Sequence, residues 1–376
     1  MKLAGIIIAQ LTPSGRGAVA SILVAGPGTI DLVNRIFSPA SGQPLGELPV
    51  GRVVFGSFQS LSDAAEEVVV GLHGPEQVEI HSHGGAFAAA AVMNVLAAKG
   101  AKIVPWQQVA EHLEPDRVVA EARVALAAAR TEKTAAILLG QYHGALRKCL
   151  EEIAAGIERQ PDNLVPPLAR LHRLLVLAPL GEHLTQPWRV FIAGAPNVGK
   201  SSLMNALVGY QRSIVFDQPG TTRDLLTAVT ALDGWPIELV DSAGLRESID
   251  ALEAAGVARA AAGMAEADLV LWVEDATSAS VACPQLGVGV LIVRNKSDLL
   301  PPGVSFTDRD LLGVSALTGQ GLDQLCQRIV QQLVPTVPAR GEAVLFTPRQ
   351  EQAIQNAVTA LSAGDSRLAV AWLRSL

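Results

Sequence analysis

Residues 194–201 read GAPNVGKS, and they decide the fold of the region around them. They fit the pattern G-x-x-x-x-G-K-[ST], with an apolar run at 190–193 before them and a helical pattern at 202–207 after them. A glycine-rich loop between a strand and a helix lets backbone N–H groups close around phosphate oxygens, and the helix N-terminus favours negative charge. This predicts a P-loop in which Lys200 reaches the β- and γ-phosphates and Ser201 binds Mg²⁺.

The sequence on either side of this loop alternates between short apolar runs and helical patterns. We expect a mostly parallel sheet covered on both faces, because its strands read as almost continuous apolar runs. The runs lie at 190–193, 237–240, 269–273 and 288–293. Asp233-Gly234 between two further apolar segments predicts a hairpin, and therefore one antiparallel edge strand. The fold class expected for residues 188–334 is an α/β P-loop domain.

Two loops after the P-loop predict contacts to the metal ion and the γ-phosphate. Residues 241–244 read DSAG after a strand, which suits a contact of Asp241 to Mg²⁺ through water and a contact of the Gly244 amide to the γ-phosphate. Thr222, in the turn-rich segment 219–224, is a candidate second Mg²⁺ ligand that binds only when the γ-phosphate is present. Taken alone, each loop also reads as an ordinary polar turn, and their order along the chain favours the site.

Residues 295–298 read NKSD after an apolar strand, and they predict the choice of base. Asp298 can accept hydrogen bonds from the ring N–H and the exocyclic amine of guanine, a pair that adenine lacks. An adenine nucleotide would leave this carboxylate unpaired, so the pattern favours GTP over ATP. In the segment 315–317, which reads SAL, the Ala316 amide is expected to meet the guanine carbonyl oxygen.

Three further zones surround the P-loop domain. Residues 1–112 mix strand patterns at 18–24, 53–58, 68–72 and 77–81 with a helix at 85–100, which predicts a small α+β domain. Residues 113–187 are mostly helical, and residues 335–376 are helical again. Since the last segment has no sheet of its own, we expect it to pack on the first helical segment. The P-loop domain would then be inserted within an α-helical domain.

Composition narrows the class of protein. The 376 residues are 49% hydrophobic and 17% charged with a net charge of −7, which is globular and argues against strong non-specific nucleic-acid binding. A local RNA contact stays open. The 3 cysteines form no metal or disulfide pattern, and no apolar run is long enough for a bilayer, so a cytoplasmic protein is expected. His81 and His83 share a strand face, but without a third ligand a structural role is favoured over a metal site.

These motifs carry a family resemblance. The chain resembles the MnmE (TrmE) family of tRNA-modification GTPases, within the TrmE–Era–EngA class. In the P-loop domain the matching phrases are GAPNVGKSSL at 194–203, GTTRD at 220–224 and DSAGLR at 241–246. In the first zone they are TPSGRGAV at 12–19, Gly26-Pro27 and VEIHSHGG at 78–85.

The resemblance implies a GTPase that is activated by K⁺ and that forms a homodimer through its G domains. Asn197 matches the K⁺-ligating asparagine of the family, and the carbonyls of Phe216 and Gln218 would complete the K⁺ site, with Thr221 beside them. Glu253 matches the glutamate that orients the attacking water, although it also reads as a solvated helix residue. Asn197, Lys200 and Glu253 are therefore the candidate catalytic residues.

The complete set of residues expected to contact GTP or GDP follows from the motifs and the resemblance together. It comprises Asn197, Val198, Gly199, Lys200, Ser201, Ser202, Phe216, Asp217, Gln218, Pro219, Gly220, Thr221, Thr222, Asp241, Ser242, Ala243, Gly244, Asn295, Lys296, Asp298, Ser315, Ala316 and Leu317.

The chain also departs from the family pattern. The family has an arginine where Leu23 stands, richer motifs where residues 73–77 and 106–110 stand, and a cysteine-containing motif where this sequence reads AWLRSL at 371–376. Two interpretations stay open. One is an active member that uses a tetrahydrofolate derivative and works on tRNA with a flavin-dependent partner resembling MnmG (GidA). The other is a paralogue that keeps the GTP switch as a regulatory or scaffold protein. A ribosome-assembly GTPase is disfavoured, because no basic patch is evident.

Overall fold

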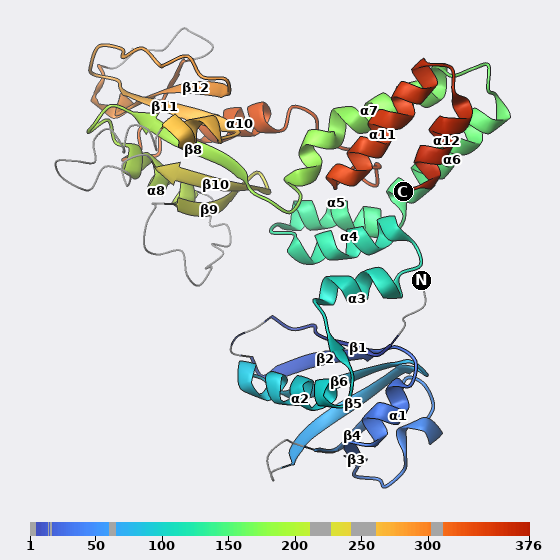
Figure 1. Cartoon of the computed structure of the whole chain (residues 1–376). Coiled ribbons are helices and arrows are strands. Elements are labelled where there is room, and N and C mark those ends of the chain that lie inside the picture. Colours follow the sequence, from blue (N-terminus) through green and yellow to red (C-terminus); the bar gives the residue numbers. More distant parts are fainter. Residues whose placement is uncertain are drawn as a thin grey trace. The chain divides into compact units, whose positions relative to one another are not determined.

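The computed structural model describes residues 5–13, 15, 17–59, 65–210, 227–241, 261–301 and 311–376. The chain divides into two compact units, Met1–Val124 and Ala125–Leu376. Figure 1 labels their helices and strands.

The first unit is built on a 7-stranded sheet of order β3-β4-β5-β6-β2-β1-β7. All neighbouring strands are antiparallel except β1 and β7, which run parallel. The strands are β1 (Ile7–Gln10), β2 (Val19–Ala25), β3 (Phe37–Pro39), β4 (Val53–Phe58), β5 (Glu66–Gly74), β6 (Gln77–His83) and β7 (Lys102–Ile103). Its helices are α1 (Thr29–Asn34), the 3₁₀ turn η1 (Leu45–Glu47), α2 (Ala86–Ala98) and α3 (Trp106–Leu113), and α4 (Arg117–Ala128) crosses the boundary between the units. The four strands and the helix expected here are present, and β5 is longer than expected.

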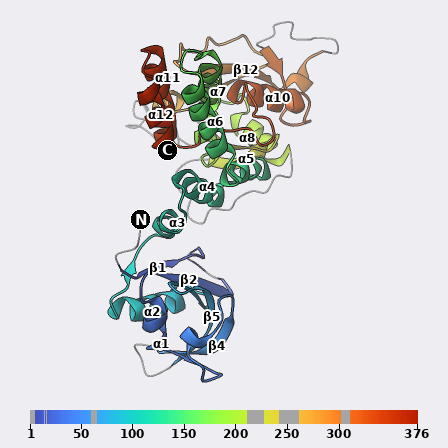
Figure 2. The same ribbon diagram turned by 90° about the vertical axis from the view of Figure 1, so that its right-hand side faces the viewer.

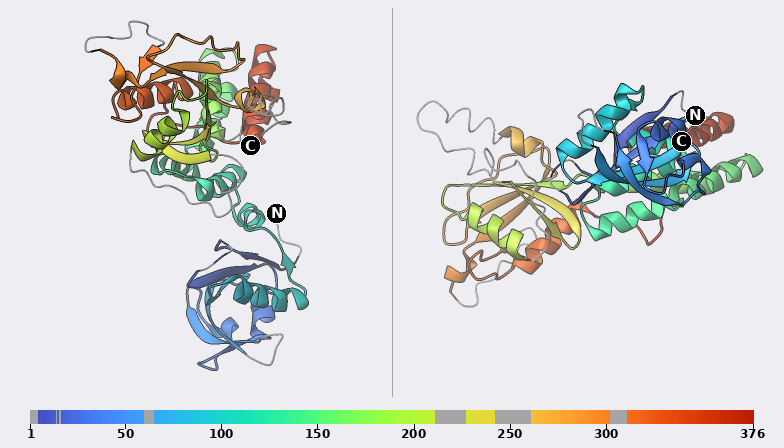
Figure 3. Two further views of the ribbon diagram at one scale, coloured as in Figure 1. Left: turned by 90° about the vertical axis from the view of Figure 1, so that its left-hand side faces the viewer. Right: turned by 90° about the horizontal axis from the view of Figure 1, so that it is seen from below.

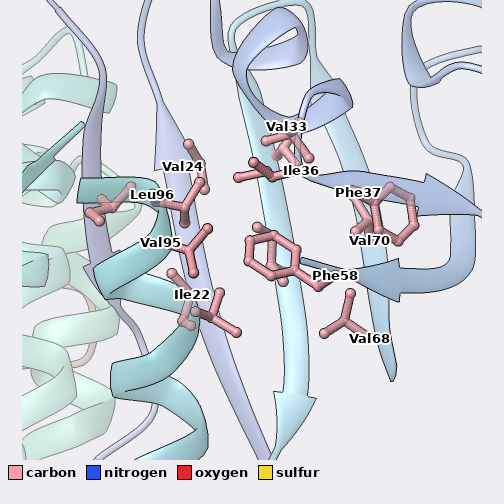
Figure 4. Close-up of a cluster of buried hydrophobic side chains, with 14 of the residues drawn as sticks. Ile22, Val24, Val33, Ile36, Phe37, Phe58, Val68, Val70, Val95 and Leu96 are labelled. Atoms are coloured by element: carbon pink, nitrogen blue, oxygen red, sulfur yellow. The ribbon is translucent and has the colours of Figure 1, made fainter. Parts of the chain in front are cut away.

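Alternation along the strands gives the first sheet two apolar faces. Figure 4 shows the larger core, where Ile22 and Phe58 from the sheet face Val95 and Leu96 of α2. The opposite face carries a smaller core at β1 and β2, against which the Trp106 side chain of α3 packs. The position of each β2 side chain in the alternation therefore decides which core it enters.

The second unit contains a 6-stranded sheet of order β13-β12-β11-β8-β10-β9. Its strands are β8 (Trp188–Gly194), β9 (Thr227–Leu232), β10 (Trp235–Asp241), β11 (Leu269–Asp275), β12 (Gly289–Asn295) and β13 (Leu311–Gly313). Every pair is parallel except β9 with β10, so the parallel sheet with one antiparallel edge strand is confirmed. Asp233 and Gly234 form the hairpin turn with φ of 47° and 76°. Positive φ at both central residues is what a tight hairpin turn requires.

Apolar side chains pack against both faces of this sheet. α8 (Lys200–Tyr210) and α10 (Leu322–Leu333) contact each other and the strands of the sheet. A separate cluster forms around Phe191, Val240 and Val270 with the partly buried Met264. A Cβ added to Gly263 would meet the Phe191 ring, so this position depends on glycine to let the chain approach the sheet.

The remaining helices of the second unit pack on one another. They are α5 (Glu132–Tyr142), α6 (Ala145–Arg159), α7 (Val165–Glu182), α11 (Pro348–Ser362) and α12 (Ser366–Arg374). α11 contacts α7 and α12 contacts α6, as Figures 2 and 3 show from three further sides. The buried Gln141 amide donates to the Glu342 carbonyl at 2.9 Å and accepts from the Val344 amide at 3.2 Å. Arg374 pairs with Glu158 at 2.8 Å.

A helix that crosses a bilayer has to be long, about 20 residues, and mostly apolar. Across the described ranges, no helix is both long enough and apolar enough to cross a membrane.

Candidate functional site

The P-loop lies where β8 ends and α8 begins, at the carboxyl edge of the parallel strands. Its backbone is unusual at Gly194, Asn197 and Gly199, whose φ angles are 144°, 63° and 89°. A Cβ on Gly194 would overlap the Val273 carbonyl oxygen, and one on Gly199 would overlap the Asn295 amide nitrogen. Glycine at these two positions is therefore required both by conformation and by the close approach of neighbouring strands.

Lys200 is buried inside the curve of this loop. Its Nζ donates to the carbonyl oxygens of Gly194 at 3.2 Å and Ala195 at 2.8 Å. Because Lys200 is also the first residue of α8, its positive charge and the free N–H groups of the helix N-terminus lie together. This arrangement suits an anion with several oxygens, such as a phosphate chain.

Ser201 and Asp241 meet beside the P-loop. The Ser201 hydroxyl donates to Asp241 Oδ2 at 2.5 Å, and Asp241, the last residue of β10, is fully buried. A hydroxyl and a carboxylate are the hard oxygen ligands that Mg²⁺ prefers. Ser201 would hold a magnesium ion here directly and Asp241 would contact it through water, which agrees with the roles expected from the sequence.

Asn295 connects the P-loop to the loop that follows β13. Its Nδ2 donates to the Val198 carbonyl at 3.0 Å and the Gly199 carbonyl at 3.4 Å, and its Oδ1 accepts from the Ala316 amide at 3.0 Å. The residue is only 2% exposed. Asn295 is thus an internal brace between two loops, and its expected contact with the nucleotide stays a prediction. A guanine carbonyl at Ala316 would have to share that amide with Asn295.

Lys296 holds the P-loop from the other side. Its Nζ donates to the Asn197 carbonyl at 2.9 Å and to Asp275 Oδ2 at 2.7 Å. The hydrogen bond from Lys296, followed by those from the Thr277 hydroxyl and amide, lowers the pKa of Asp275 to about 2, so this carboxylate is ionised at neutral pH. Sequence reasoning missed Asp275, although it ends strand β11 just as Asp241 ends β10.

A cavity of about 290 Å³ lies beside these residues, between the P-loop and the segment after β11. It is lined by P-loop residues including Asn197, by Glu274 and Asp275, and by Lys296. Glu274 is buried and pairs with Arg294 at 2.9 Å across the neighbouring strands. The side chains around the P-loop are thus positioned by ion pairs as well as by the backbone.

Asp298 lies half-buried in the 3₁₀ turn η3 (Ser297–Leu299), and no described residue donates a hydrogen bond to its carboxylate. The Ser297 amide donates to the Val314 carbonyl at 3.0 Å, which joins this turn to the 315–317 loop. Ser315 is buried and its hydroxyl accepts from the Thr318 amide, whereas Leu317 is 88% exposed. An available carboxylate and an exposed leucine on two joined loops suit a flat base with polar edges.

Of the predicted site residues not yet placed, the structure describes one and leaves the others outside its described ranges. Ser202 lies in the first turn of α8. The residues outside the described ranges are Phe216, Asp217, Gln218, Pro219, Gly220, Thr221, Thr222, Ser242, Ala243, Gly244 and Glu253.

The chain is similar to several known proteins. Residues 189–295 match the family model described as a 50S ribosome-binding GTPase. The chain is 34% identical over 388 residues to the tRNA modification GTPase MnmE of Thermus thermophilus, covering 95% of this chain and 88% of that protein. It is 32% identical over 395 residues to the tRNA modification GTPase MnmE of Chlamydia pneumoniae, covering 96% and 89%. Among solved structures, the G domain of the T. maritima FeoB iron transporter is 26% identical, with a TM-score of 0.27 over 39% of this chain and 99% of that chain.

The brace predicts the effect of Asn295→Ala. This change leaves the buried Val198 carbonyl and Ala316 amide without their partner, which costs about 1–3 kcal/mol of unfolding free energy. Looser loops should also weaken nucleotide binding by about tenfold or more. Denaturant unfolding and nucleotide titration measure both effects. Asn356→Ala on the exposed side of α11 is the matched control, and wild-type values for Asn295→Ala would contradict the brace.

Proposed function

The chain belongs to the family of the tRNA modification GTPase MnmE, and on this premise we propose that it binds GTP at the P-loop and hydrolyses it to GDP. The observation that carries the proposal is the Ser201–Asp241 hydrogen bond of 2.5 Å beside the buried Lys200. These groups provide a cation for the phosphates, a hydroxyl ligand for a metal and a carboxylate that can hold one of its waters, all at the same edge of the sheet.

Hydrolysis in this site depends mainly on position and charge. The P-loop amides and Lys200 orient the phosphate chain and attract the negative charge that develops on its oxygens. Ser201, with Asp241 beside it, would hold Mg²⁺, which would supply positive charge close to the phosphates. On this proposal the Ser201 oxygen would hold the metal while its hydroxyl hydrogen still donates to Asp241, and Glu253 orients the attacking water.

We assign guanine recognition to Asp298. Its carboxylate has no hydrogen-bond donor among the described residues, and it lies on the turn that the Ser297–Val314 hydrogen bond ties to the 315–317 loop. A half-buried carboxylate without a donor favours a ligand that supplies two N–H groups, as guanine does.

Asn197 is proposed as a ligand of K⁺. Its side chain is exposed while its carbonyl is fixed by Lys296, so the amide can turn toward a bound nucleotide. A monovalent cation there would add positive charge where the phosphates lie. By the family resemblance, we also propose that the carbonyls of Phe216 and Gln218 and the segment around Thr221 complete this site, and that the G domains of two copies of the chain pair during hydrolysis.

The domain boundaries are also proposed. Residues 188–334 would form a G domain inserted between two helical segments, 113–187 and 335–376, and residues 1–112 would form a separate α+β domain. The support is that α11 contacts α7, that α12 contacts α6, and that Arg374 pairs with Glu158.

The folate position of the first unit does not fit a tetrahydrofolate derivative. Leu23 stands where the family pattern has an arginine, and it is 4% exposed within an apolar cluster. That cluster contains Ile7, Ala9, Ala25, Val104 and Val109 with Trp106 and Leu113 against it. An apolar core has no group to pair with the carboxylates and the polar ring of a folate, and burying them there would be costly.

We propose that the chain serves tRNA modification, as the names of its relatives suggest. By the family resemblance, we also propose that it works in the cytoplasm with a partner resembling MnmG (GidA). The apolar replacement at Leu23 favours a second candidate, a paralogue that keeps the GTP switch as a regulatory or scaffold protein.

Asp298→Asn tests the guanine assignment. An asparagine amide can donate to the extra carbonyl of xanthine but cannot accept both guanine N–H groups, so affinity for GTP should fall by about 100-fold while affinity for xanthosine triphosphate rises. Fluorescent-nucleotide titration measures both affinities. Asp365→Asn, at the N-cap of α12, is the control. Unchanged preference for GTP in Asp298→Asn would contradict the assignment.

Cation dependence tests the catalytic residues. Wild-type protein should hydrolyse GTP faster in K⁺ than in Na⁺ of equal ionic strength, and Asn197→Ala should remove the difference.

Glu253→Ala should retain GTP affinity and slow hydrolysis by about 100-fold or more, the usual size of a general acid–base contribution. Phosphate release measures each rate. Equal rates in the two cations, or an active Glu253→Ala, would overturn the respective assignment.

Complementation separates the two candidate functions. A bacterial strain that lacks its own family member would carry this chain, and mass analysis would measure its modified wobble uridines. Restored modification supports the tRNA-modifying candidate. Absent modification with intact GTP hydrolysis supports the paralogue.

Calorimetric titration of the purified chain with a reduced folate should show no binding, and measurable binding would contradict our interpretation of the apolar cluster around Leu23.

A further inference from the structure

A groove of about 560 Å³, the α6–α7 groove, lies on the second unit between α6, α7 and the loop before α11. The space is left open by small residues, namely Ala145, Ala169, Gly341 and Ala343. The loop side is fixed, because the buried Gln141 amide is hydrogen-bonded to the backbone on both sides of Ala343. The volume is typical of small-molecule sites, and none of the described P-loop residues lies in the lining.

Three cationic side chains line the α6–α7 groove. They are Lys148 of α6 and Arg170 and Arg173 of α7. The two arginines are three residues apart in the sequence, so they lie on the same face of their helix. Lys148 lines the groove from the neighbouring helix, and its Nζ has no ion-pair partner among the described residues. The groove therefore brings together positive charges from two helices.

Two carboxylates hold the arginines in position. Arg173 Nε and Nη2 donate to the two oxygens of Glu342 at 2.7 and 3.1 Å, and Arg170 Nη2 donates to Glu152 at 2.7 Å and to Cys149 Sγ at 3.6 Å. The hydrogen bonds from these arginines lower the pKa of both glutamates, so both are charged at neutral pH. A guanidinium has five N–H donors, and the contacts of each arginine use two of them. Both arginines are thus fixed and still have donors for a ligand.

The balance of charge and the directions of the donors favour a phosphate. Among the lining side chains, positive charges exceed negative ones by one, although the chain has a net charge of −7. The oxygens of a phosphate point in several directions, so side chains from two helices can reach them at once, and arginine and lysine both bind phosphate well. The oxygens of a carboxylate lie in one plane and suit a single guanidinium. Because a phosphate alone is much smaller than the groove, the rest of the space can take an organic group.

Cys149 also lines the groove, and its state favours binding over catalysis. Burial raises the pKa of the Cys149 thiol, even though Arg170 Nη2 is 3.6 Å from the sulfur. A protonated thiol is a weak nucleophile, because the thiolate is the reactive form. The described lining of the groove therefore offers donors and charge to a ligand, and no activated nucleophile.

We propose that the α6–α7 groove binds a phosphate ester, supplied either by a free nucleotide or by one nucleotide unit of an RNA chain. Lys148, Arg170 and Arg173 hold the phosphate, and the space beside the small residues takes the sugar or the base. Glu152 and Glu342 keep the two guanidinium groups in position. This site is separate from the proposed GTP site and does not depend on GTP binding.

Alkylation of Cys149 by N-ethylmaleimide tests the site in the full chain. Uridine monophosphate and a short oligouridylate are the two probes, and mass spectrometry follows the alkylation of each cysteine. Cys283 is also partly exposed and lies outside the groove, so it is the internal reference. Each probe that binds should slow the alkylation of Cys149 in a saturable way and leave that of Cys283 unchanged.

The two probes distinguish the two sources of the phosphate. Protection of Cys149 by uridine monophosphate assigns the site to free nucleotides. Protection by the oligouridylate alone assigns it to RNA. An alkylation rate of Cys149 that neither probe changes overturns the proposal.

Arg170→Gln removes one cation from the groove. The probe concentration that gives half-maximal protection of Cys149 should rise by about tenfold, because a charge-assisted hydrogen bond is lost. For the oligouridylate, the slope of log affinity against log salt should become smaller by about 0.7, the value for one phosphate contact of a single strand. Arg159→Gln, near the end of α6 and outside the groove, is the matched control and should change neither value.

Glu152→Gln and Ala169→Leu distinguish a ligand site from a structural ion pair. Glutamine still accepts from Arg170 but carries no charge, so Glu152→Gln should tighten binding of the probe, whereas a purely structural pair predicts no gain. Ala169→Leu fills the groove from an exposed position of α7 and should prevent protection, and Ala371→Leu on α12 is its control. Weaker binding in Glu152→Gln, or full protection in Ala169→Leu, would contradict the proposal. Fluorescent-GTP titration of the same samples tests the GTP site separately.

Discussion

One buried amide holds the two halves of the nucleotide site together. Asn295 is bonded to the P-loop through Val198 and Gly199 and to the neighbouring loop through Ala316. Leaving a buried amide unpaired costs free energy. The two loops therefore take the positions in which Asn295 makes all three hydrogen bonds. This constraint extends to the sequence, since the Asn295 nitrogen occupies the space that a Cβ on residue 199 would need. The shape of the phosphate loop is thus set by strand β12 as much as by the loop itself.

Local patterns in the sequence were sufficient to predict much of the parallel sheet in the second unit. The apolar runs predicted the parallel strands, because strands buried on both faces cannot alternate with polar residues. Asp233-Gly234 predicted the hairpin, since few other dipeptides accept positive φ twice. The pairing of Lys296 with Asp275 and the brace role of Asn295 were not predictable, because side-chain partners brought together by the fold leave no periodicity in the sequence. Lys133 and Asp233, 100 residues apart, are the same case.

The two units differ in how they use buried polar groups. The second unit buries Asp241 and Asn295 around the phosphate loop, each with a hydrogen bond to a residue from another part of the chain, and it buries Ser315 with hydrogen bonds inside its own loop. In the first unit, Leu23 stands where the family pattern has an arginine, and it packs against aliphatic side chains. Buried polar groups are retained where a ligand or a loop has to be oriented, and apolar groups are sufficient where a surface only has to be closed. Fewer side chains would therefore be accepted at the buried positions around the phosphate loop than at the position of Leu23.

The Gln141 contact has a consequence for how the chain folds during synthesis. Its side-chain amide lies in α5 and donates to the Ile137 carbonyl one turn earlier, but its other partners are the backbone of Glu342 and Val344, 201 and 203 residues later. At about 5–20 residues per second, the ribosome makes that stretch in roughly 10–40 seconds. Through that interval α5, α6 and α7 exist without α11 and α12, while the strands of the parallel sheet are completed in between. These three helices therefore emerge before the parallel sheet but complete their packing only after it has been made.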